Sequence, residues 1–338
     1  SYSQYNYLMD RRRKKLEIWA QALLGDEIVI KVASADASFR RYFRVTYLED
    51  KVEQSAILMD APPELEDSRP FVSIAKSLRD CGVNAPEIHS IDFEQGFMLL
   101  SDLGSTPYLT QLNSDSADSL YGDAIAVLLT MQQDWPSSHK LPEYDRELLL
   151  REMELFPEWY LKQHLKIDIS AELRSMLNQQ FALLAESALE QPQVTVHRDY
   201  HSRNLMVVSS KVDGVNPGVI DFQDAVRGAI TYDLVSLLRD SYIAWPRKQV
   251  ESWVADYYAQ LKHSGAVADI EWQQFLRWFD WMGVQRHIKV VGIFSRLNHR
   301  DEKPSYLADI PLTLNYIKDV TSRYRELAPL YDLVSSLK

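Results

Sequence analysis

The pattern of hydrophobic and polar positions predicts a chain that begins with strands and continues with helices. A leading amphipathic helix is predicted because four apolar residues follow the spacing of one helix face: Leu16, Trp19, Ala20 and Leu23. Short hydrophobic runs bounded by turn-forming residues predict strands over 28–33, 42–47, 55–59, 88–93 and 96–100. A helix is predicted over 71–81, between the third and fourth of these strands.

The rest of the chain is predicted to be mostly helical. Apolar residues recur at helical spacing over 119–133, 146–164 and 171–190, and helices resume near Tyr232. A strand-rich segment, 194–220, interrupts them. Strands followed by helices predict the α+β class, with a small sheet-containing lobe over 1–103 and a larger helical lobe over 104–338.

Composition narrows the function classes. Of 338 residues, 46% are hydrophobic and the net charge is −11, which predicts a folded protein that does not wrap nucleic acid. The basic run 11–15 is therefore interpreted as a solvated helix face. The single cysteine, Cys81, excludes an internal disulfide. No apolar run reaches about 18 residues and no signal peptide is recognisable, so we expect a cytoplasmic protein without a membrane partner.

The strand-rich segment carries the candidate chemistry. His197, Asp199 and Asn204 follow a short β-branched run, and Asp221 follows another apolar run 17 residues after Asn204. This is the kinase spacing H-x-D-x-x-x-x-N followed by an Asp on a strand. One carboxylate can accept the proton of an attacking hydroxyl, while an amide oxygen and a second carboxylate bind magnesium. A hairpin that pairs 205–208 with 218–220 would bring the two metal ligands together.

Two structural alternatives apply to these residues. Asp199, Asn204 and Asp221 could instead be loop caps in a strand-rich insertion. His197 is interpreted as a packed, hydrogen-bonded support rather than as a catalytic base.

The segment 197–205 resembles the catalytic loop of the aminoglycoside phosphotransferase-like family, relatives of protein kinases that phosphorylate small molecules. The segment 220–225 resembles the family's metal-binding segment, although Gln223 stands where protein kinases have glycine, and 232–238 resembles the helix that follows. The resemblance implies a bilobal protein-kinase-like fold and the cofactors ATP and Mg²⁺. It further implies that Asp199 is the catalytic base, that Asn204 and Asp221 bind the metal, and that Asp233 supports the loop.

Three further segments, 36–44, 59–64 and 285–294, resemble bacterial anomeric kinases. Those enzymes phosphorylate N-acetylmuramate and N-acetylglucosamine at the C1 hydroxyl during cell-wall recycling. The resemblance implies an amino sugar and a nucleotide as binding partners, and it does not indicate an oligomeric state.

The first lobe departs from the protein-kinase pattern. The loop 34–41 contains no glycine, so Ser38 is a candidate phosphate contact, with an ordinary hairpin turn as the alternative. The third strand has no lysine near Leu58 or Met59, and Lys31, Arg41 or Arg44 is expected to supply the missing charge. Because 96–103 resembles the strand that enters the kinase hinge, adenine is expected at Ser101, Asp102 and Leu103.

The acceptor side is indicated by cations near the end of the chain. Arg286 and Lys289 share a helix face, with His287 adjacent, and with Arg296 and Arg300 they could form a cationic stripe suited to a substrate carboxylate. The alternative is a solvated face. Tryptophans are concentrated over 245–281, where helical spacing favours core packing over sugar stacking.

Three functions remain open from the sequence. The first is an ATP-dependent sugar kinase. The second keeps the fold with another alcohol as acceptor, such as an aminoglycoside, choline or homoserine, because a fold does not determine a substrate. The third is a regulatory pseudokinase that binds nucleotide without transferring phosphate.

Overall fold

The chain folds into two compact units. The computed structural model describes residues 2–35, 39–209, 214–267 and 269–337. The first unit comprises Ser1–Thr106 and Met206–Gln223, and the second comprises Pro107–Leu205 and Asp224–Lys338. The first boundary therefore lies three residues beyond the predicted one, and the first unit also contains a later segment that the prediction had placed in the second.

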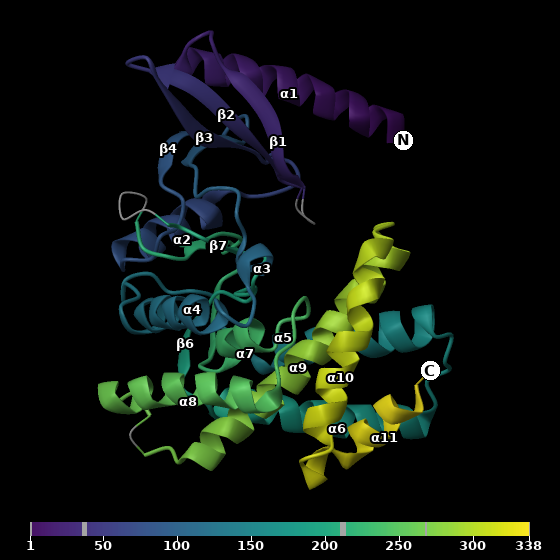
Figure 1. The fold of residues 1–338 in the computed structure, drawn as a ribbon. Coiled ribbons are helices and arrows are strands. Elements are labelled where there is room, and N and C mark those ends of the chain that lie inside the picture. Colours follow the sequence, from purple (N-terminus) through teal and green to yellow (C-terminus); the bar gives the residue numbers. More distant parts are fainter. Residues whose placement is uncertain (1, 36–38, 210–213, 268, 338) are drawn as a thin grey trace. The chain divides into compact units, whose positions relative to one another are not determined.

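The first unit is built on a five-stranded antiparallel sheet with the strand order β1-β2-β3-β5-β4 (Figure 1). Its strands are β1 (Val29–Ala35), β2 (Arg41–Glu49), β3 (Val52–Asp60), β4 (Ile88–Asp92) and β5 (Phe97–Ser101). Its helices are α1 (Tyr2–Leu24) and α2 (Arg69–Asp80). All five strands and both helices overlap the segments predicted from hydrophobic spacing.

Helix α1 covers one face of this sheet. Its Leu16 and Ala20 are buried in one core cluster with Phe43 and Leu58 of the sheet. The carboxylate of Asp60, at the end of β3, is fully buried and accepts hydrogen bonds from two arginines. These donors are Arg12 Nη2 of α1 (2.6 Å) and Arg41 Nη2 of β2 (2.6 Å). Hydrophobic burial and a buried ion-pair group thus attach the same helix to the sheet.

The segment Met206–Gln223 joins the first unit through backbone and ring contacts. The backbone N–H of Val219 donates to the carbonyl of Asn84 (2.9 Å), and the Phe222 ring lies 4.9 Å from that of Phe71 in α2. Strands β7 (Leu205–Met206) and β8 (Gly218–Val219) form a two-stranded sheet, which is the predicted hairpin in shortened form. The sequence had no signal for the contacts with α2, because they depend on tertiary packing.

The second unit is helical apart from one strand pair, β6 (Gln193–Val196) with β9 (Val226–Ala229). Its first helices are α3 (Tyr108–Gln111), α4 (Ala117–Gln133), α5 (Arg146–Met153), the π-helix η1 (Phe156–His164) and α6 (Ala171–Glu190). Those that follow β9 are α7 (Tyr232–Leu238), α8 (Arg247–Ser264), α9 (Trp272–His299), the 3₁₀ helix η2 (Pro304–Asp309), α10 (Ile310–Thr321), the 3₁₀ turn η3 (Arg325–Leu327) and α11 (Ala328–Ser336).

Helix α9 lies inside this unit, with α5, α6, α7 and α10 among the elements that contact it (Figure 1). Every residue from Trp278 to Gly292 is buried, so the helix has no solvent face over that stretch. Gly292 allows η1 to approach closely, since a Cβ at this position would lie 2.4 Å from the carbonyl carbon of Leu155. The predicted helix 146–164 is accordingly interrupted between Met153 and Phe156 and continues as a π-helix.

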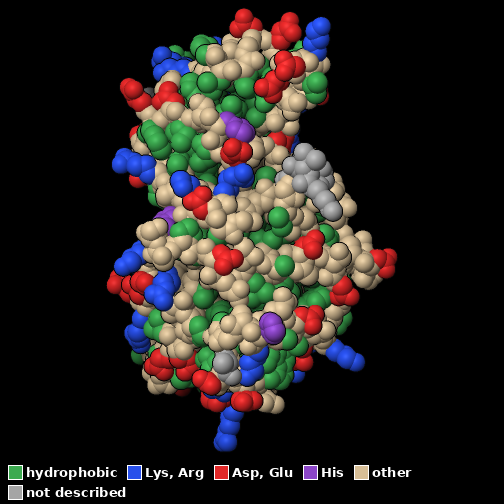
Figure 2. All heavy atoms as spheres, turned by 90° about the vertical axis from the view of Figure 1, so that its left-hand side faces the viewer, with side chains coloured by type: hydrophobic (Ala, Val, Ile, Leu, Met, Phe, Trp, Pro, Cys, Tyr) green, Lys and Arg blue, Asp and Glu red, His purple; other side chains and the backbone are tan. Residues whose placement is uncertain are grey.

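Charged side chains of both signs are interspersed on the surface shown in Figure 2. In the described ranges, no helix combines the length and the apolar character that crossing a bilayer requires.

Candidate active site

The loop that carries Asp199 follows β6 and is fixed at its start by Asp233. The Asp233 carboxylate, in the first turn of α7, accepts hydrogen bonds from the backbone N–H groups of His197 (2.7 Å) and Arg198 (3.0 Å). His197 is 1% exposed, and its Nδ1 accepts a hydrogen bond from the backbone N–H of Asp199 (3.1 Å). Burial raises the pKa of Asp233 to about 6, against the opposing effect of His197. His197 and Asp233 thus brace the backbone next to Asp199.

Arg198 has a strained backbone conformation that its side chain holds in place. Its φ is 83°, a region that bulky L-residues rarely adopt. The guanidinium donates to Glu152 Oε2 (2.7 Å) and lies 5.3 Å from the centroid of the Tyr144 ring. The Tyr144 hydroxyl also donates a short hydrogen bond to Glu152. Such strain persists where surrounding contacts over-determine it, and here those contacts fix the peptide that precedes Asp199.

The second half of the loop is attached to the helices around it. Tyr200 is fully buried and its hydroxyl donates to the carbonyl of Ala124 in α4 (2.7 Å). The carboxylate of Asp240, just after α7, accepts from the Ser202 backbone N–H (3.0 Å) and from its hydroxyl. The loop is therefore fixed at both ends by buried carboxylates, Asp233 and Asp240, on either side of one short helix.

Asp199 lies among cations contributed by α9. Arg286 Nη2 is 3.9 Å from Asp199 Oδ1, and the Asp199 side chain is 41% exposed, so the carboxylate remains accessible. Burial alone would raise the pKa of Asp199, but the positive charges of Lys289 and Arg286 outweigh this effect and lower the pKa below its ordinary value. Asp199 is thus ionised at neutral pH, which is the state required of a general base.

The solvated-face alternative for Arg286 and Lys289 is wrong, because these residues are 4% and 6% exposed. Lys289 Nζ lies 3.0 Å from Glu152 Oε2 and donates to the Tyr232 hydroxyl (3.1 Å). His287 is 1% exposed, stacks on Tyr316 and hydrogen-bonds through Nε2 to the carbonyl of Arg239 (2.9 Å). The predicted continuous stripe is not formed, since Arg300 is exposed and pairs with its neighbour Asp301.

The two predicted metal ligands belong to different units, Asn204 to the second and Asp221 to the first. Asn204 Nδ2 donates to the Asp199 carbonyl (2.9 Å), which fixes the plane of the amide. Asp221 has a φ of 58°, and its Oδ1 accepts a hydrogen bond from Gln223 Nε2 (2.6 Å). A non-glycine residue in this region is often found at a functional site.

The side chains of Asn204 and Asp221 are better suited to Mg²⁺ than to a cation that requires all of its ligands from the protein. Across the described residues, no group of three or more His, Cys, Asp or Glu side chains is arranged to hold a metal ion. Magnesium prefers hard oxygen ligands and retains several waters, so it is commonly held by one or two carboxylates together with substrate phosphates. The Asp221 carboxylate in the first unit and the Asn204 amide in the second each carry an oxygen of the kind that Mg²⁺ prefers.

The predicted nucleotide residues of the first unit are organised around Asp102. Arg44 Nε donates to Asp102 Oδ2 (2.7 Å), and the Ser55 hydroxyl donates to the same oxygen (2.8 Å). Hydrogen bonds from these groups lower the pKa of Asp102 although burial opposes the shift. Ser101 belongs to β5, and its hydroxyl accepts from the backbone N–H of Glu87 (2.8 Å). Leu103 follows Asp102, while Ser38 lies outside the described residues.

The three candidate replacements for the missing lysine differ in their surroundings. Arg41 is engaged with Asp60 and with the carbonyl of Met9 in α1 (3.0 Å). Arg44 lies on the opposite face of β2, since the two residues are three apart on one strand. Lys31 pairs with Arg44 in register across β1 and β2 and is exposed. Arg41 is committed to the attachment of α1 and Arg44 to the Asp102 carboxylate, and the role of Arg44 as a nucleotide contact stays a prediction.

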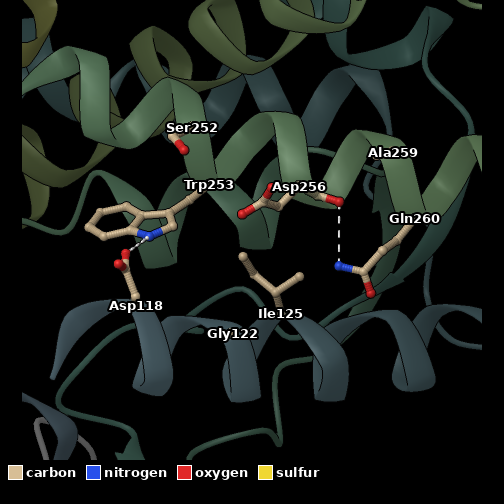
Figure 3. Close-up of a pocket in the computed structure, with 8 residues that line it drawn as sticks. All are labelled: Asp118, Gly122, Ile125, Ser252, Trp253, Asp256, Ala259 and Gln260. Atoms are coloured by element: carbon tan, nitrogen blue, oxygen red, sulfur yellow. Dashed lines mark hydrogen bonds between the residues drawn. The ribbon is translucent and has the colours of Figure 1, made fainter.

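A separate cavity of about 580 Å³ opens between α4 and α8 (Figure 3). Trp253 Nε1 donates to Asp118 Oδ1 across it (2.8 Å), and Asp256 and Gln260 line it from α8. None of its lining residues was predicted to act in catalysis, and none belongs to the Asp199 loop.

Glu152 and Asp240 were missed in the sequence analysis. Glu152 resembles any other acidic residue of an amphipathic helix, and only the packing of α5 against α9 places it beside Arg198 and Lys289. Asp240 had a weak signal, as an acidic residue directly after an apolar helix, where the helix dipole disfavours negative charge. Such a position suggests a buried partner, which here is Ser202.

Known proteins resemble this chain in sequence and in fold. Residues 29–276 match the phosphotransferase enzyme family. The N-acetylmuramate/N-acetylglucosamine kinases of Pseudomonas putida and Pseudomonas aeruginosa are 44% and 42% identical to it, each over 97% of both chains. The solved structure of a Plasmodium vivax ethanolamine kinase has a TM-score of 0.65 at 12% identity, covering 94% of this chain and 88% of that one. These findings confirm the protein-kinase-like α+β fold and the resemblance predicted from the catalytic loop, and the chain belongs to the phosphotransferase enzyme family.

Proposed function

We propose that this protein transfers the γ-phosphoryl group of ATP to the C1 hydroxyl of an N-acetylated amino sugar, either N-acetylmuramate or N-acetylglucosamine. The observation that carries the proposal is an ionised, accessible Asp199 held beside Arg286 on a loop with the kinase spacing. The relatives from Pseudomonas putida and Pseudomonas aeruginosa are N-acetylmuramate/N-acetylglucosamine kinases, which supports an amino sugar as the acceptor. We place the reaction in the cytoplasm, where ATP is available.

In this proposal Asp199 accepts the proton of the C1 hydroxyl as that oxygen attacks phosphorus. Asn204 and Asp221 would hold Mg²⁺, which when bound would neutralise charge on the phosphate oxygens. Arg286 lies close enough to Asp199 to contact the reacting groups from the acceptor side. Lys289 and His287 support the site without contacting the sugar, because both are buried. Lys289 donates to the Tyr232 hydroxyl, and His287 is hydrogen-bonded to the Arg239 carbonyl.

For the nucleotide we propose the segment Ser101–Leu103, with backbone groups binding adenine as in a kinase hinge. Arg44 and Asp102 hold this segment, since Asp102 Oδ1 accepts from the Gly104 backbone N–H (2.9 Å) and Arg44 Nη2 donates to the Gly104 carbonyl (3.2 Å). Ser38 is proposed as a phosphate contact on the sequence pattern alone.

Phosphorus NMR of the reaction products tests the function. The protein is incubated with ATP, Mg²⁺ and each amino sugar in turn, and a C1 phosphate is distinguished from a C6 phosphate by its coupling to the anomeric proton. A C1 phosphate from either sugar is expected. Formation of a C6 phosphate would overturn the assignment of the hydroxyl, and nucleotide binding without any sugar phosphate would favour a regulatory pseudokinase.

A further inference from the structure

A row of aromatic rings runs from the catalytic loop to η2 within the second unit. The His201 ring lies edge-on to Tyr242 (5.4 Å between centroids), and Tyr242 lies 6.3 Å from Phe294 of α9. Phe294 in turn stacks on Tyr306 of η2 (5.4 Å). Tyr242 and Tyr306 are both partly exposed, so the row that begins at His201 of the Asp199 loop has two rings that reach the surface. Aromatic faces of this kind pack well against the apolar face of a sugar ring.

Arg203, on the same loop as Asp199, lies flat on this row. Its guanidinium carbon is 3.7 Å from the centroid of the Tyr242 ring, a close cation–π contact. Stacking uses the face of the guanidinium and leaves its N–H edge available for a planar anion. Within the described residues, the Arg203 side chain forms no hydrogen bond or ion pair, and the residue is exposed. Arg203 therefore differs from Lys289, whose ammonium group forms an ion pair with the carboxylate of Glu152.

The surrounding charges leave Arg203 available to a ligand. Burial raises the pKa of Tyr242, whereas Arg203 and Arg286 both oppose that rise, so the two cations act on one hydroxyl from nearby positions. Two carboxylates are close to this group, Asp240 and Asp309. Asp240 is engaged with Ser202, while burial raises the pKa of Asp309 and Arg203 opposes that rise. Neither carboxylate forms a hydrogen bond or an ion pair with the Arg203 guanidinium in the described part of the chain, so the N–H edge of Arg203 is not used by either of them.

We propose that Arg203, held flat on Tyr242, recognises the carboxylate of an acidic amino sugar while the sugar ring packs against Tyr242 and Tyr306. The inference rests on the proposed function, and it assigns the preference of the enzyme for the acidic sugar to the Arg203 side chain. N-acetylmuramate differs from N-acetylglucosamine only by the lactyl ether that carries its carboxylate on the C3 oxygen, so one cation is sufficient to tell them apart. A guanidinium with a free N–H edge binds a carboxylate through two parallel hydrogen bonds.

Arg286 is unsuited to that selection because of its position. It lies beside Asp199, where the C1 hydroxyl reacts, and that hydroxyl is common to both sugars. The lactyl carboxylate is attached on C3, away from the reacting carbon, and requires a cation displaced from Asp199. Arg203 meets this requirement, since it follows Asp199 by four residues and its side chain extends to Tyr242.

The experiment compares Arg203→Gln with the wild type on both sugars. We expect kcat/KM for N-acetylmuramate to fall about 10- to 100-fold, the range of a lost charge-assisted contact, and kcat/KM for N-acetylglucosamine to change by less than about threefold. Arg323→Gln is the matched control, because Arg323 is an exposed arginine in an i,i+4 pair with Asp319 and should affect neither sugar. Equal losses on both sugars, or no loss on either, would overturn the role of Arg203.

A change in the substrate tests the same contact without altering the fold. The wild type should phosphorylate N-acetylmuramate more efficiently than its lactyl amide, and Arg203→Gln should lose this preference. A wild type that treats the acid and the amide alike would overturn the inference whatever the variant does. Failure of the wild type to phosphorylate either sugar would instead refute the proposed function, so the two failures are distinguishable.

Discussion

The guanidinium of Arg286 lies 3.9 Å from the carboxylate of Asp199, although only 5% of the Arg286 side chain is exposed. Removing an arginine from water costs free energy, which a nearby carboxylate offsets only in part. The position is explained if the cation also acts on charge that develops at Asp199 and at the transferred phosphoryl group. Arg286 would then serve the reaction itself rather than the choice of sugar.

Replacing Arg286 should therefore slow phosphorylation of both sugars alike. For Arg286→Gln we expect kcat to fall about 10- to 1,000-fold, the range seen when one preorganised charge contact is lost. The ratio of kcat/KM between N-acetylmuramate and N-acetylglucosamine should stay within about threefold of the wild type. Steady-state kinetics on both sugars measures this ratio. A loss confined to N-acetylmuramate would instead support the role expected from the sequence, in which Arg286 binds the substrate carboxylate.

Asp199→Asn should remove the proton acceptor while leaving the loop intact. The backbone N–H of Asp199 and the carbonyl bonded by Asn204 do not depend on the side chain. We expect kcat to fall about 10²- to 10⁴-fold, as for loss of a general base, with nucleotide affinity unchanged. Calorimetric titration with ATP and Mg²⁺ provides the control. Retention of more than about a tenth of the wild-type kcat would show that another group accepts the proton.

Asp221→Asn should lower the affinity of the enzyme for Mg²⁺. An amide keeps one oxygen ligand but removes the negative charge that attracts Mg²⁺. The Mg²⁺ concentration giving half-maximal rate is expected to rise at least about tenfold, and excess Mg²⁺ should partly restore the rate. The unfolding temperature, measured without metal, serves as the check on folding. An unchanged Mg²⁺ dependence would place the metal on other residues.

His287 should make the protein less stable in mild acid. Burial lowers the pKa of His287 from its ordinary value near 6.5 to about 3, against the opposing hydrogen bond to Arg239. The folded state therefore excludes a proton that the unfolded chain accepts, so stability is complete above about pH 6.5 and is lost as the pH falls toward 3. At pH 5 the loss from this residue is about 2 kcal/mol.

Urea unfolding at several pH values measures this effect. His287→Gln should show a shallower fall in the free energy of unfolding between pH 7 and pH 5 than the wild type, whatever its stability at pH 7. Parallel curves for the two proteins would mean that His287 is protonated in the folded state.

Asp60→Ala should destabilise the first unit strongly. The substitution leaves Arg12 and Arg41 partly buried without their common carboxylate. Breaking a buried ion pair in this way costs about 3–5 kcal/mol. Asp80→Ala is the matched control, because Asp80 is 53% exposed and pairs with Lys76 on the surface, where a cost below about 1 kcal/mol is expected. Chemical denaturation of both variants gives the comparison, and equal costs would contradict the role of Asp60.

The sheet and most helices could be predicted because their signals are local. Alternation of hydrophobic residues located β2 within a few residues of its observed bounds, Arg41–Glu49, and helical spacing located α6 over Ala171–Glu190. The break between α5 and η1 could not be predicted, because it accompanies the close approach of Leu155 to Gly292, far along the chain. The placement of 206–223 in the first unit likewise depends on contacts with Asn84 and Phe71.

The candidate site was predictable where chemistry fixes both residue type and spacing. Asp199, Asn204 and Asp221 meet that condition for the proposed phosphoryl transfer, and their roles stay predictions. The burial of Arg286 and Lys289 was not predictable, because a helix buried on every side has no polar face to distinguish it. Arg203 and Tyr242 were missed because their contact joins the loop to a residue beyond α7.

The burial of α9 limits how this protein can change. The helix that places Arg286 beside Asp199 also contributes fully buried hydrophobic residues such as Phe279 and Ile288. If the proposed function holds, a substitution on this helix alters both catalysis and folding, and selection for a new acceptor meets both constraints. Tyr242 and Tyr306 lie outside α9 and are partly exposed. Evolution and engineering toward other sugars should therefore accumulate changes around these two tyrosines while α9 is inherited intact.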